Sequence, residues 1–507
     1  MAFIMALDQG TSSSRAVIYD AQGVLQASAQ QPISPSYPQD GWVEQDPMEI
    51  WQSILSVGRR ALTEAGLQGS DLTGIGITNQ RETTLLWDRH NGDCLYNAIV
   101  WQDRRGAAQC EALAEAKAVD GASVAEIIQH QTGLIIDPYF SSTKLSWLLD
   151  TVPGARERAE AGDLCFGTVD SFLIWHLTCG RRHVTDASNA SRTQLFDIRS
   201  QQWSPVLLDV FAVPPELLPE VLDNTGEFGV ADPQWFGAAI PICGVAGDQQ
   251  AALIGQACFE PGMSKSTYGT GCFVMTNTGS EIPHSSQRLL STVAYRLGGQ
   301  TTYALEGSIF VAGAAVQWLR DSLCLIDDAA ETEAAFRRSA GDSGGVFVVP
   351  ALSGLGAPYW RPDARGLITG LTFQSDRDQV ITAFLQSMGF QTLALLRAMI
   401  ADNAPVTTLR VDGGMVVNDA LCQFLADLLQ VPVERPEDVE TTVRGAGVLA
   451  AMGSGLVEDF GAAAEAWQLN RAFVPRMESS RRQTLVEGYD AAIRQVLAAT
   501  KQPENDG

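Results

Sequence analysis

Two Gly-Thr turns, each set between apolar strands, are the segments of this chain best suited to bind a phosphorylated ligand. One lies in FIMALDQGTSSSRAVIYD (3–20) and the other in KSTYGTGCFVMTNT (265–278). In the first, Asp8 ends a strand, and the backbone N–H groups of residues 10–14 form a concave donor surface suited to phosphate oxygens. A carboxylate beside such a surface indicates a divalent cation between them. Either segment alone could be an ordinary β-hairpin, but their recurrence in both halves of the chain favours a two-part nucleotide site.

Two polar segments carry charged residues that could bind and activate an alcohol. In TNQRETT (78–84), Arg81 and Glu82 offer donors and acceptors side by side, as the binding of several hydroxyl groups requires; a solvated ion pair is the alternative. In AGDQQAAL (246–253), Asp248 lies among small residues, where a carboxylate can accept the proton of an attacking alcohol. Asp248 also precedes a helical run and could be a helix N-cap, and the two roles are compatible.

Two glycine-containing segments near the C-terminus could bind a nucleotide or simply pack closely. VDGGMVVN (411–418) places Gly413 and Gly414 between a strand and a helix, so that a base or ribose could lie against backbone without a Cβ atom, with the Asn418 amide nearby. A plain strand-to-helix turn explains this pattern equally well. GAGVLA (445–450) matches a dinucleotide-type glycine pattern, but no convincing strand precedes it, and small residues in a helix usually serve close packing. We therefore expect no Rossmann-type site.

Alternating strands and helices must position these segments. Apolar periodicity predicts this alternation on both sides of a Gly-, Pro-, Asp- and Trp-containing segment, 223–239, which is typical of an α/β fold in each half. The Asp-Pro pair at 46–47 predicts the start of an amphipathic helix. Strands are predicted at 3–31 (three antiparallel strands), 72–77, 83–88, 164–169, 240–246, 265–278, 292–306 and 346–350. Helices are predicted at 46–66, 106–117, 142–151, 205–212, 311–323, 378–401 and 481–499. A strand, a Gly-Gly turn and a helix are predicted in succession at 409–429.

The length of the chain predicts more than one domain. A chain of 507 residues is too long for one hydrophobic core, so two large domains with a ligand cleft between them are expected. We place the boundary after residue 246, which gives domains of residues 1–246 and 247–507.

Composition excludes several classes of partner. The net charge of −25 argues against binding to nucleic acid or to an anionic membrane surface. No stretch approaches about 20 uninterrupted apolar residues, so no membrane insertion is expected. The nine cysteines form no CxxC and the five histidines have no ligand spacing, so neither a disulfide framework nor a zinc site is indicated. A reducing cytoplasm fits this cysteine usage.

Taken in order, the motifs resemble the FGGY family of carbohydrate kinases, and within it the members that phosphorylate glycerol. The resemblance runs from about residue 3 to about residue 475. Its motifs are ALDQGT, GWVEQDPMEIW, TNQRETT, IVWQDRR, IDPYFSSTK, AGDQQAAL, YGTGCF, ALEGSIFVAGAAVQWLRD, GLGAPYW and VDGGMVVN.

This resemblance implies a fold, an activity and a set of site residues. It implies two ribonuclease-H-like domains of the actin/hexokinase/Hsp70 type that close on ATP, Mg²⁺ and glycerol, and ATP-dependent formation of sn-glycerol 3-phosphate by in-line transfer. Asp248 resembles the family's general base, with Gln249 beside it. The family residues that hydrogen-bond glycerol are matched by Arg81, Glu82, Tyr139 and Asp248, and those that pack on its carbon chain by Trp101 and Phe273. The phosphate-contacting turn is matched by Thr11, Ser12, Ser13 and Arg15, and the aspartate near magnesium by Asp8. The positions that contact ADP or ATP are matched by Thr270, Gly313, Gln317, Gly414 and Asn418.

The resemblance also implies a homo-oligomer, since dimers and tetramers are common in the family. It does not extend to a Gly-rich, Arg-containing loop that binds fructose 1,6-bisphosphate in some members, because VADPQWFGAAIP (230–241) has no basic residue there. Two alternatives stay open. One is a kinase of the same fold for another polyol or sugar, such as xylulose, gluconate or erythritol. The other is a non-catalytic nucleotide-binding switch, which would have no use for Arg81, Glu82 and Trp101 in one cleft.

Overall fold

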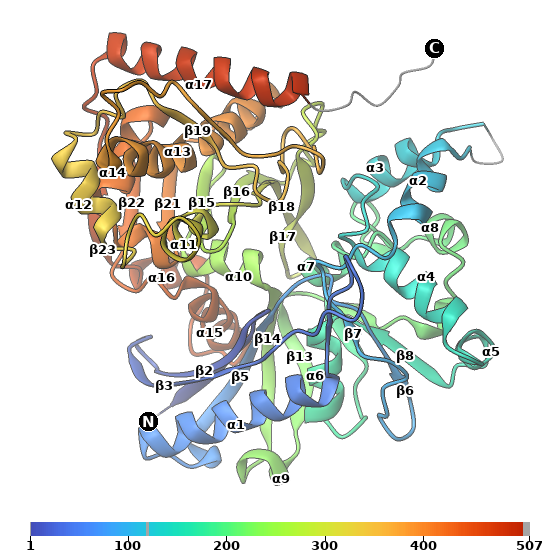
Figure 1. Ribbon diagram of the computed structural model, residues 1–507. Helices are drawn as coiled ribbons and strands as arrows, with labels where there is room; N and C mark the ends of the chain where they lie inside the picture. The colour runs from blue at the N-terminus through green and yellow to red at the C-terminus, as the bar shows by residue number, and fades with distance from the viewer. Residues whose placement is uncertain (1, 118–120, 500–507) are drawn as a thin grey trace.

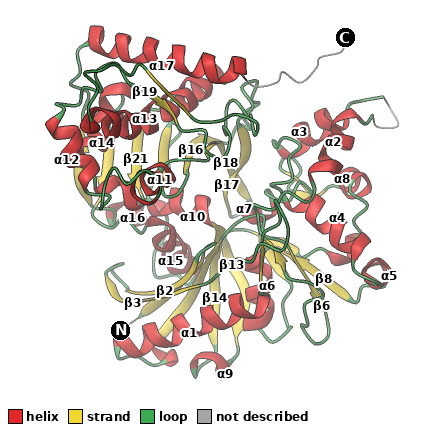
Figure 2. Ribbon diagram, in the orientation of Figure 1, coloured by secondary structure: helices red, strands yellow, loops and turns green. Residues whose placement is uncertain are grey.

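A computed structural model describes residues 2–117 and 121–499 and places two central β-sheets, one in each half of the chain. Figure 1 shows the two halves as separate lobes, coloured blue to green and green to red, with helices on both faces of each sheet. Figure 2 shows that strands occupy the centre of each lobe and helices its outside. The predicted α/β architecture is therefore present in both halves.

The first sheet has six strands in the order β13-β14-β5-β1-β2-β3. β1, β2 and β3 form an antiparallel meander, β5 and β14 continue from β1 in parallel, and β13 closes the edge antiparallel to β14. Their bounds are β1 Phe3–Gln9, β2 Ser13–Asp20, β3 Leu25–Pro32, β5 Leu72–Asn79, β13 Thr225–Ala231 and β14 Ile240–Gly247.

The second sheet has seven strands in the order β17-β18-β16-β15-β21-β22-β23. β15, β16 and β18 are antiparallel neighbours, β21 and β22 continue from β15 in parallel, and β23 closes the edge antiparallel to β22. Their bounds are β15 Met263–Tyr268, β16 Cys272–Gly279, β17 Leu290–Leu297, β18 Gln300–Ile309, β21 Thr408–Asp412, β22 Val433–Pro436 and β23 Leu469–Phe473.

The two predicted hairpins occupy equivalent places in these sheets. β1–β2 and β15–β16 are each the first hairpin of their sheet, and a parallel strand lies beside the first strand of each. Both Gly-Thr turns therefore lie at the same end of equivalent strands. This repeated topology is the structural basis of the sequence recurrence.

In the first half, helices cover the sheet, and further helices form a smaller lobe beside it. α1 begins and ends as its sequence predicts, because the Asp46 carboxylate accepts a hydrogen bond from Met48 N at 2.8 Å and Gly66 ends the helix at φ 68°. The helices are α1 Pro47–Ala65, α2 Ala107–Glu115, α3 Val124–Thr132, α4 Ser141–Thr151, α5 Ala155–Glu160, α6 Val169–Leu177, α7 Ala187–Ala190, α8 Pro205–Val210 and α9 Pro233–Phe236, and α10 Asp248–Gly255 follows directly after the predicted domain boundary. Short strands accompany them: β4 Glu44–Gln45, β6 Leu85–Asp88, β7 Ala98–Ile99, β8 Leu164–Gly167, β9 Val184–Asp186, β10 Phe196–Asp197, β11 Gln202–Trp203 and β12 Glu220–Leu222.

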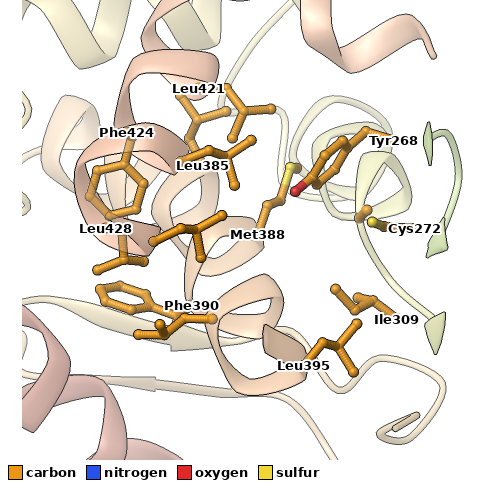
Figure 3. Close-up of a cluster of buried hydrophobic side chains, with 14 of the residues drawn as sticks. Tyr268, Cys272, Ile309, Leu385, Met388, Phe390, Leu395, Leu421, Phe424 and Leu428 are labelled. Carbon is orange, nitrogen blue, oxygen red and sulfur yellow. The ribbon is translucent and has the colours of Figure 1, made fainter. Parts of the chain in front are cut away.

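The core of the second half lies between its sheet and two helices. Figure 3 shows Met388 of α13 beside Tyr268 and Leu395 beside Ile309 of the sheet, with Leu421, Phe424 and Leu428 of α14 on the opposite side. The second-half helices are α11 Gly313–Asp321, α12 Glu331–Arg338, α13 Arg377–Ala401, α14 Asp419–Leu429, α15 Thr441–Gly453, α16 Phe460–Glu465 and α17 Ser479–Ala499, and the strands outside the sheet are β19 Phe347–Val349 and β20 Leu367–Thr369.

One core helix has the length and composition of a membrane span. Among residues 2–117 and 121–499, α13 alone passes this test, and 83% of the tested window is buried inside the protein. Its apolar surface is covered by the second sheet and α14.

Two helices join the sheets. α10 packs on β15, β16 and β17, whereas α15 comes from the second half but packs on β1, β5 and β14 of the first sheet, and α10 and α15 pack against each other. A Cβ atom added to Gly445 would lie 1.8 Å from the Ala251 carbonyl oxygen, and one added to Gly76 would lie 2.1 Å from that of Ala446. The glycines of GAGVLA thus serve close helix packing, as expected. The domain boundary between residues 246 and 247 stays a prediction. It assigns α15 to the second domain, although α15 packs on the first sheet.

Candidate active site

The first Gly-Thr turn follows β1 and brings Asp8 and Thr11 close to the junction of the two halves. Gly10 N donates to Ser13 O at 2.9 Å, which closes the turn. The Thr11 hydroxyl accepts a hydrogen bond from Trp101 Nε1 at 2.9 Å, so the predicted phosphate turn lies directly beside a predicted acceptor residue. Ser12 is exposed, as a ligand-contacting side chain requires.

Two further residues of this turn are engaged by protein groups. The Ser13 hydroxyl accepts from Gln30 Nε2 at 2.8 Å. Arg15 forms an ion pair with Glu440, the residue before α15, and donates from Nη2 to Gln30 Oε1 at 3.1 Å. The Arg15 guanidinium therefore has two protein partners, and its remaining N–H groups could donate to a phosphate group.

Asp248 is the first residue of α10, and Gly247 is the N-cap, so the N-cap alternative for Asp248 is wrong. Arg81 Nε lies 3.1 Å from Asp248 Oδ1. The Asp248 side chain is 30% exposed, whereas that of Arg81 is 2% exposed and that of Glu82 1%. The Asp248 carboxylate is therefore oriented by a buried guanidinium and still open to a ligand.

Arg81 and Glu82 belong to a buried ion network and not to a solvated pair. Arg81 Nη1 lies 2.6 Å from Glu306 Oε2, and Arg192 Nε lies 2.6 Å from Glu82 Oε1. Burial opposes the charge of Glu306, but Arg192 and Arg81 lower its pKa to about 2. Burial raises the pKa of Glu82 against the opposing effect of the same arginines. The predicted acceptor-binding pair is thus fixed from behind by charges in the protein core.

Three aromatic side chains from distant segments form one wall beside this network. The ring centroids of Trp101 and Tyr139 are 5.6 Å apart and those of Trp101 and Phe273 are 6.4 Å apart, both edge-to-face. Trp101 and Tyr139 belong to the first half, whereas Phe273 lies on β16 of the second sheet. Apolar walls of this kind suit the carbon chain of a small polyol.

Gln249, the residue after Asp248, is held by a buried lysine. Lys265 Nζ donates to Gln249 Oε1, and to Thr267 Oγ1 at 3.0 Å. Because the carbonyl oxygen of the Gln249 amide accepts from Lys265, its NH₂ group is left to donate to a ligand.

A pocket of about 220 Å³ lies beside the second Gly-Thr turn. Four predicted nucleotide-contacting residues line it, namely Thr270, Gly313, Gln317 and Gly414, together with Tyr268, Gly269, Val316, Arg320, Ala329 and Met415. A Cβ atom added to Gly313 would lie 2.6 Å from Gly269 O, so this glycine is needed for the close approach of α11 to the turn. A Cβ atom added to Gly414 would meet nothing within 4 Å and would project into open space.

Asn418, the fifth predicted nucleotide contact, is engaged by the protein. Its Oδ1 accepts from Leu421 N at 3.0 Å as the N-cap of α14, and its Nδ2 donates to Thr332 Oγ1 at 3.2 Å. It is not among the pocket-lining residues.

Asp8 has the properties of a carboxylate that would bind a cation. Burial raises its pKa to about 7, and the negative charges of Asp248 and Glu440 oppose the lowering effect of Arg15. Among the described residues, none donates a hydrogen bond to the Asp8 carboxylate. No group of three or more His, Cys, Asp or Glu in the described part of the chain could hold a metal by itself. This donor set fits Mg²⁺, which commonly uses one or two carboxylates, water and substrate phosphates.

Four residues of the site were missed by sequence reasoning: Arg192, Lys265, Glu306 and Arg320. Glu306 and Arg320 lie within the motif ALEGSIFVAGAAVQWLRD, but no pattern marked them individually. Lys265 stands out as one of only four lysines in the chain and so as a candidate for local positive charge, but no motif gave it a role. Arg192 carried no signal, because it follows the short helix α7 in a polar segment that reads as a loop.

Comparison with known proteins gives extensive matches. The model of the FGGY family of carbohydrate kinases, N-terminal domain, matches residues 3–255, and that of the C-terminal domain matches residues 265–454. Glycerol kinase 1 of Pseudomonas aeruginosa is 57% identical over 97% of this chain and 99% of its own length. A glycerol kinase of Alteromonas mediterranea is 54% identical over 97% of this chain and 99% of its own.

Solved structures agree with the family match. The structure of Plasmodium falciparum glycerol kinase with ADP is 33% identical, covers 98% of both chains and superposes with a TM-score of 0.90. A xylulose kinase of Lactobacillus acidophilus, 21% identical with a TM-score of 0.87 and coverage of 98% and 99%, shares the fold. The expected two-domain α/β kinase fold is thereby confirmed. With both domain models matched across most of its length, the chain belongs to the FGGY family of carbohydrate kinases.

Proposed function

We propose that the protein transfers the γ-phosphoryl group of ATP to a primary hydroxyl of glycerol, giving sn-glycerol 3-phosphate and ADP. The observation that carries the proposal is the position of Asp248, an open carboxylate 3.1 Å from the buried Arg81 guanidinium. It lies where residues of both halves meet, and near-full-length relatives with 54–57% identity are glycerol kinases. The wall of Trp101, Tyr139 and Phe273 suits the carbon chain of this substrate.

In the proposed reaction, a glycerol hydroxyl attacks the γ-phosphorus in line with the leaving ADP. Asp248 accepts the hydroxyl proton, and Arg81 holds its carboxylate in place. Arg15 and backbone N–H groups of the first turn bind the transferred group, except that of Gly10, which donates to Ser13 O. Arg81 and Glu82, together with the Tyr139 hydroxyl, bind the other glycerol hydroxyls, and the Gln249 amide donates alongside them.

The nucleotide would occupy the pocket beside the second turn, with magnesium at the first. We propose that Asp8 helps to hold Mg²⁺, which neutralises phosphate charge when bound. Thr270, Gly313, Gln317 and Gly414 would contact the nucleoside part. Asn418 would join them through the second N–H of its amide, since one N–H donates to Thr332.

Measurement of ADP release with and without glycerol tests this proposal directly. We expect ADP formation to depend on glycerol and product analysis to give glycerol 3-phosphate. Xylulose, gluconate and erythritol serve as competing acceptors, since the fold also hosts a xylulose kinase. A larger kcat/KM for one of these acceptors would replace glycerol in the proposal, and ATP binding without any acceptor-dependent turnover would favour the nucleotide-binding switch.

Substitution Gly414→Val tests the nucleotide pocket. A Cβ atom at position 414 meets no protein atom within 4 Å, so the fold should be unchanged. Because Gly414 lines the pocket, the valine side chain should occupy part of its volume. We expect the Kd for ADP to rise about 10–100-fold, the equivalent of overpacking by about 1–3 kcal/mol. Calorimetric titration measures the Kd, and an unchanged melting temperature of the free protein is the control. An unchanged Kd would remove Gly414 from the nucleotide site.

The pKa of Asp8 predicts a pH-dependent affinity for the magnesium–nucleotide complex. With a pKa of about 7, the ionised fraction of Asp8 falls about tenfold between pH 8 and pH 6. Since protons compete with the cation for this carboxylate, the affinity for Mg·ADP should fall about tenfold over the same interval. Asp8→Asn should bind Mg·ADP weakly at both pH values. A full tenfold pH effect in Asp8→Asn would assign the titration to another group.

Three further features belong to the proposal. The domains would comprise residues 1–246 and 247–507. The protein would be a dimer or tetramer, to be measured by sedimentation. It would act in the cytoplasm, an expectation supported by nine cysteines that are all free thiols.

A further inference from the structure

Four charged side chains lie together, almost fully buried, where the two halves meet. Arg81, Glu82, Arg192 and Glu306 are each exposed by 2% or less. The first three come from the first half, and Glu306 comes from β18 of the second sheet. Two positive and two negative charges make the set neutral, and loss of any one of them leaves a buried charge uncompensated.

Glu306 fixes the plane of the Arg81 guanidinium. Arg81 Nη1 donates to Glu306 Oε2 at 2.6 Å and Nη2 donates to Oε1 at 3.1 Å. A guanidinium is rigid and planar, so this two-point contact also determines where its Nε points. Nε lies 3.1 Å from Asp248 Oδ1. The direction of the Asp248 carboxylate therefore depends on a residue that it does not touch.

Glu306 acts on the second acceptor-site carboxylate in the same way. Its Oε1 also accepts from Arg192 Nη2 at 3.0 Å, and Arg192 Nε donates to Glu82 Oε1 at 2.6 Å. Both oxygens of Glu306 are thus occupied by arginines, and its side chain is 0% exposed. It has no access to an acceptor, yet it anchors both arginines that contact acceptor-site carboxylates.

We propose that Glu306 is a positioning residue for the acceptor site, through which β18 of the second sheet orients Asp248 by way of Arg81 and Glu82 by way of Arg192. The inference rests on the proposed function. It adds a requirement that the two halves share one charge network for the acceptor to be aligned with the phosphate.

Substitution Glu306→Gln keeps the shape of the side chain and removes its charge. We expect kcat/KM for glycerol to fall about 100-fold, as for a misplacement of about 1 Å at a reacting group. The Kd for ADP should stay within about threefold of wild type, because Glu306 does not line the nucleotide pocket. A wild-type kcat/KM would overturn the proposal.

A double-mutant cycle separates positioning from a general structural role. If Glu306 acts through Arg81 on Asp248, Glu306→Gln should lower kcat by less than about threefold in an Asp248→Asn background, although it lowers kcat strongly alone. Equal effects in both backgrounds would overturn the inference and leave the proposed function standing. Absence of glycerol-dependent ADP release in the wild type would instead reject the proposed function.

A matched control and a second variant complete the test. Asp223 pairs with Arg296 Nε at 2.5 Å, also between the two halves but outside the acceptor site, so Asp223→Asn should keep wild-type kcat/KM. A loss equal to that of Glu306→Gln would show that any weakened contact between the halves suffices, and would overturn the proposal. Glu306→Asp keeps the charge but moves the carboxylate away from the arginines, and it tests the proposal if Glu306→Gln does not fold. We expect it to lower kcat/KM for glycerol at least tenfold. Wild-type kcat/KM in Glu306→Asp would overturn the proposal.

Discussion

Asp248→Asn is expected to lower kcat by about 10²–10⁴-fold, the range typical of a general acid or base. Asparagine has nearly the same shape but cannot accept the hydroxyl proton. Because Asp248 lies at the start of α10 and not in the nucleotide pocket, the Kd for ADP should stay close to wild type. Steady-state ADP release and calorimetric ADP binding measure the two quantities.

Asp419 offers a matched control for this substitution. It is the first residue of α14, is 30% exposed like Asp248, and pairs with Arg435 Nη1 at 3.0 Å. Asp419→Asn should therefore reproduce the loss of a partly exposed, arginine-paired carboxylate without loss of activity. If Asp248→Asn retained more than half of the wild-type kcat, the proton would have another acceptor.

Arg81→Met is expected to destabilise the protein by about 3–5 kcal/mol as well as to abolish acceptor binding. Its removal leaves Glu82 and Glu306 buried, with Arg192 as the arginine that contacts both of them, and breaking a buried ion pair typically has this cost. Denaturant unfolding monitored by circular dichroism measures the change in free energy.

A surface ion pair provides the control for Arg81→Met. Arg397 lies 3.1 Å from Asp490, with side chains 46% and 36% exposed, so Arg397→Met should change the free energy of unfolding by less than about 1 kcal/mol. Equal losses in the two variants would mean that the buried network is not what stabilises the junction. The double variant Arg81→Met with Glu306→Leu should recover part of the loss, because it removes the second carboxylate and leaves Glu82 paired with Arg192.

The local parts of this molecule could be predicted from sequence. The Gly-Thr hairpins, the Asp46-capped helix α1 and the alternation of strands and helices depend on neighbouring residues, and the structure confirms them. Asp248 could be singled out because an isolated carboxylate among small residues is a local pattern. Its alternative role as an N-cap was wrong by one position, since Gly247 occupies that place.

The ion network could not be predicted in the same way. Arg81 and Glu306 are separated by 225 positions, and Arg192 and Glu306 by 114, so nothing near either residue indicates its partner. Arg81 and Glu82 looked equally compatible with a solvated pair, because burial of a polar loop depends on the other half of the chain. The engagement of Asn418 by Thr332 was invisible for the same reason.

The helix that packs on the first sheet has a consequence for synthesis of the protein. β14, the last strand of that sheet along the chain, ends at Gly247, and α15 begins at Thr441. At translation rates of about 5–20 residues per second, ribosomes need roughly 10–40 s to make the intervening segment. During that delay the nascent first half exposes the apolar sheet face that α15 will later cover. A chain truncated before α15 would keep this face exposed, and we expect it to aggregate after release from the ribosome.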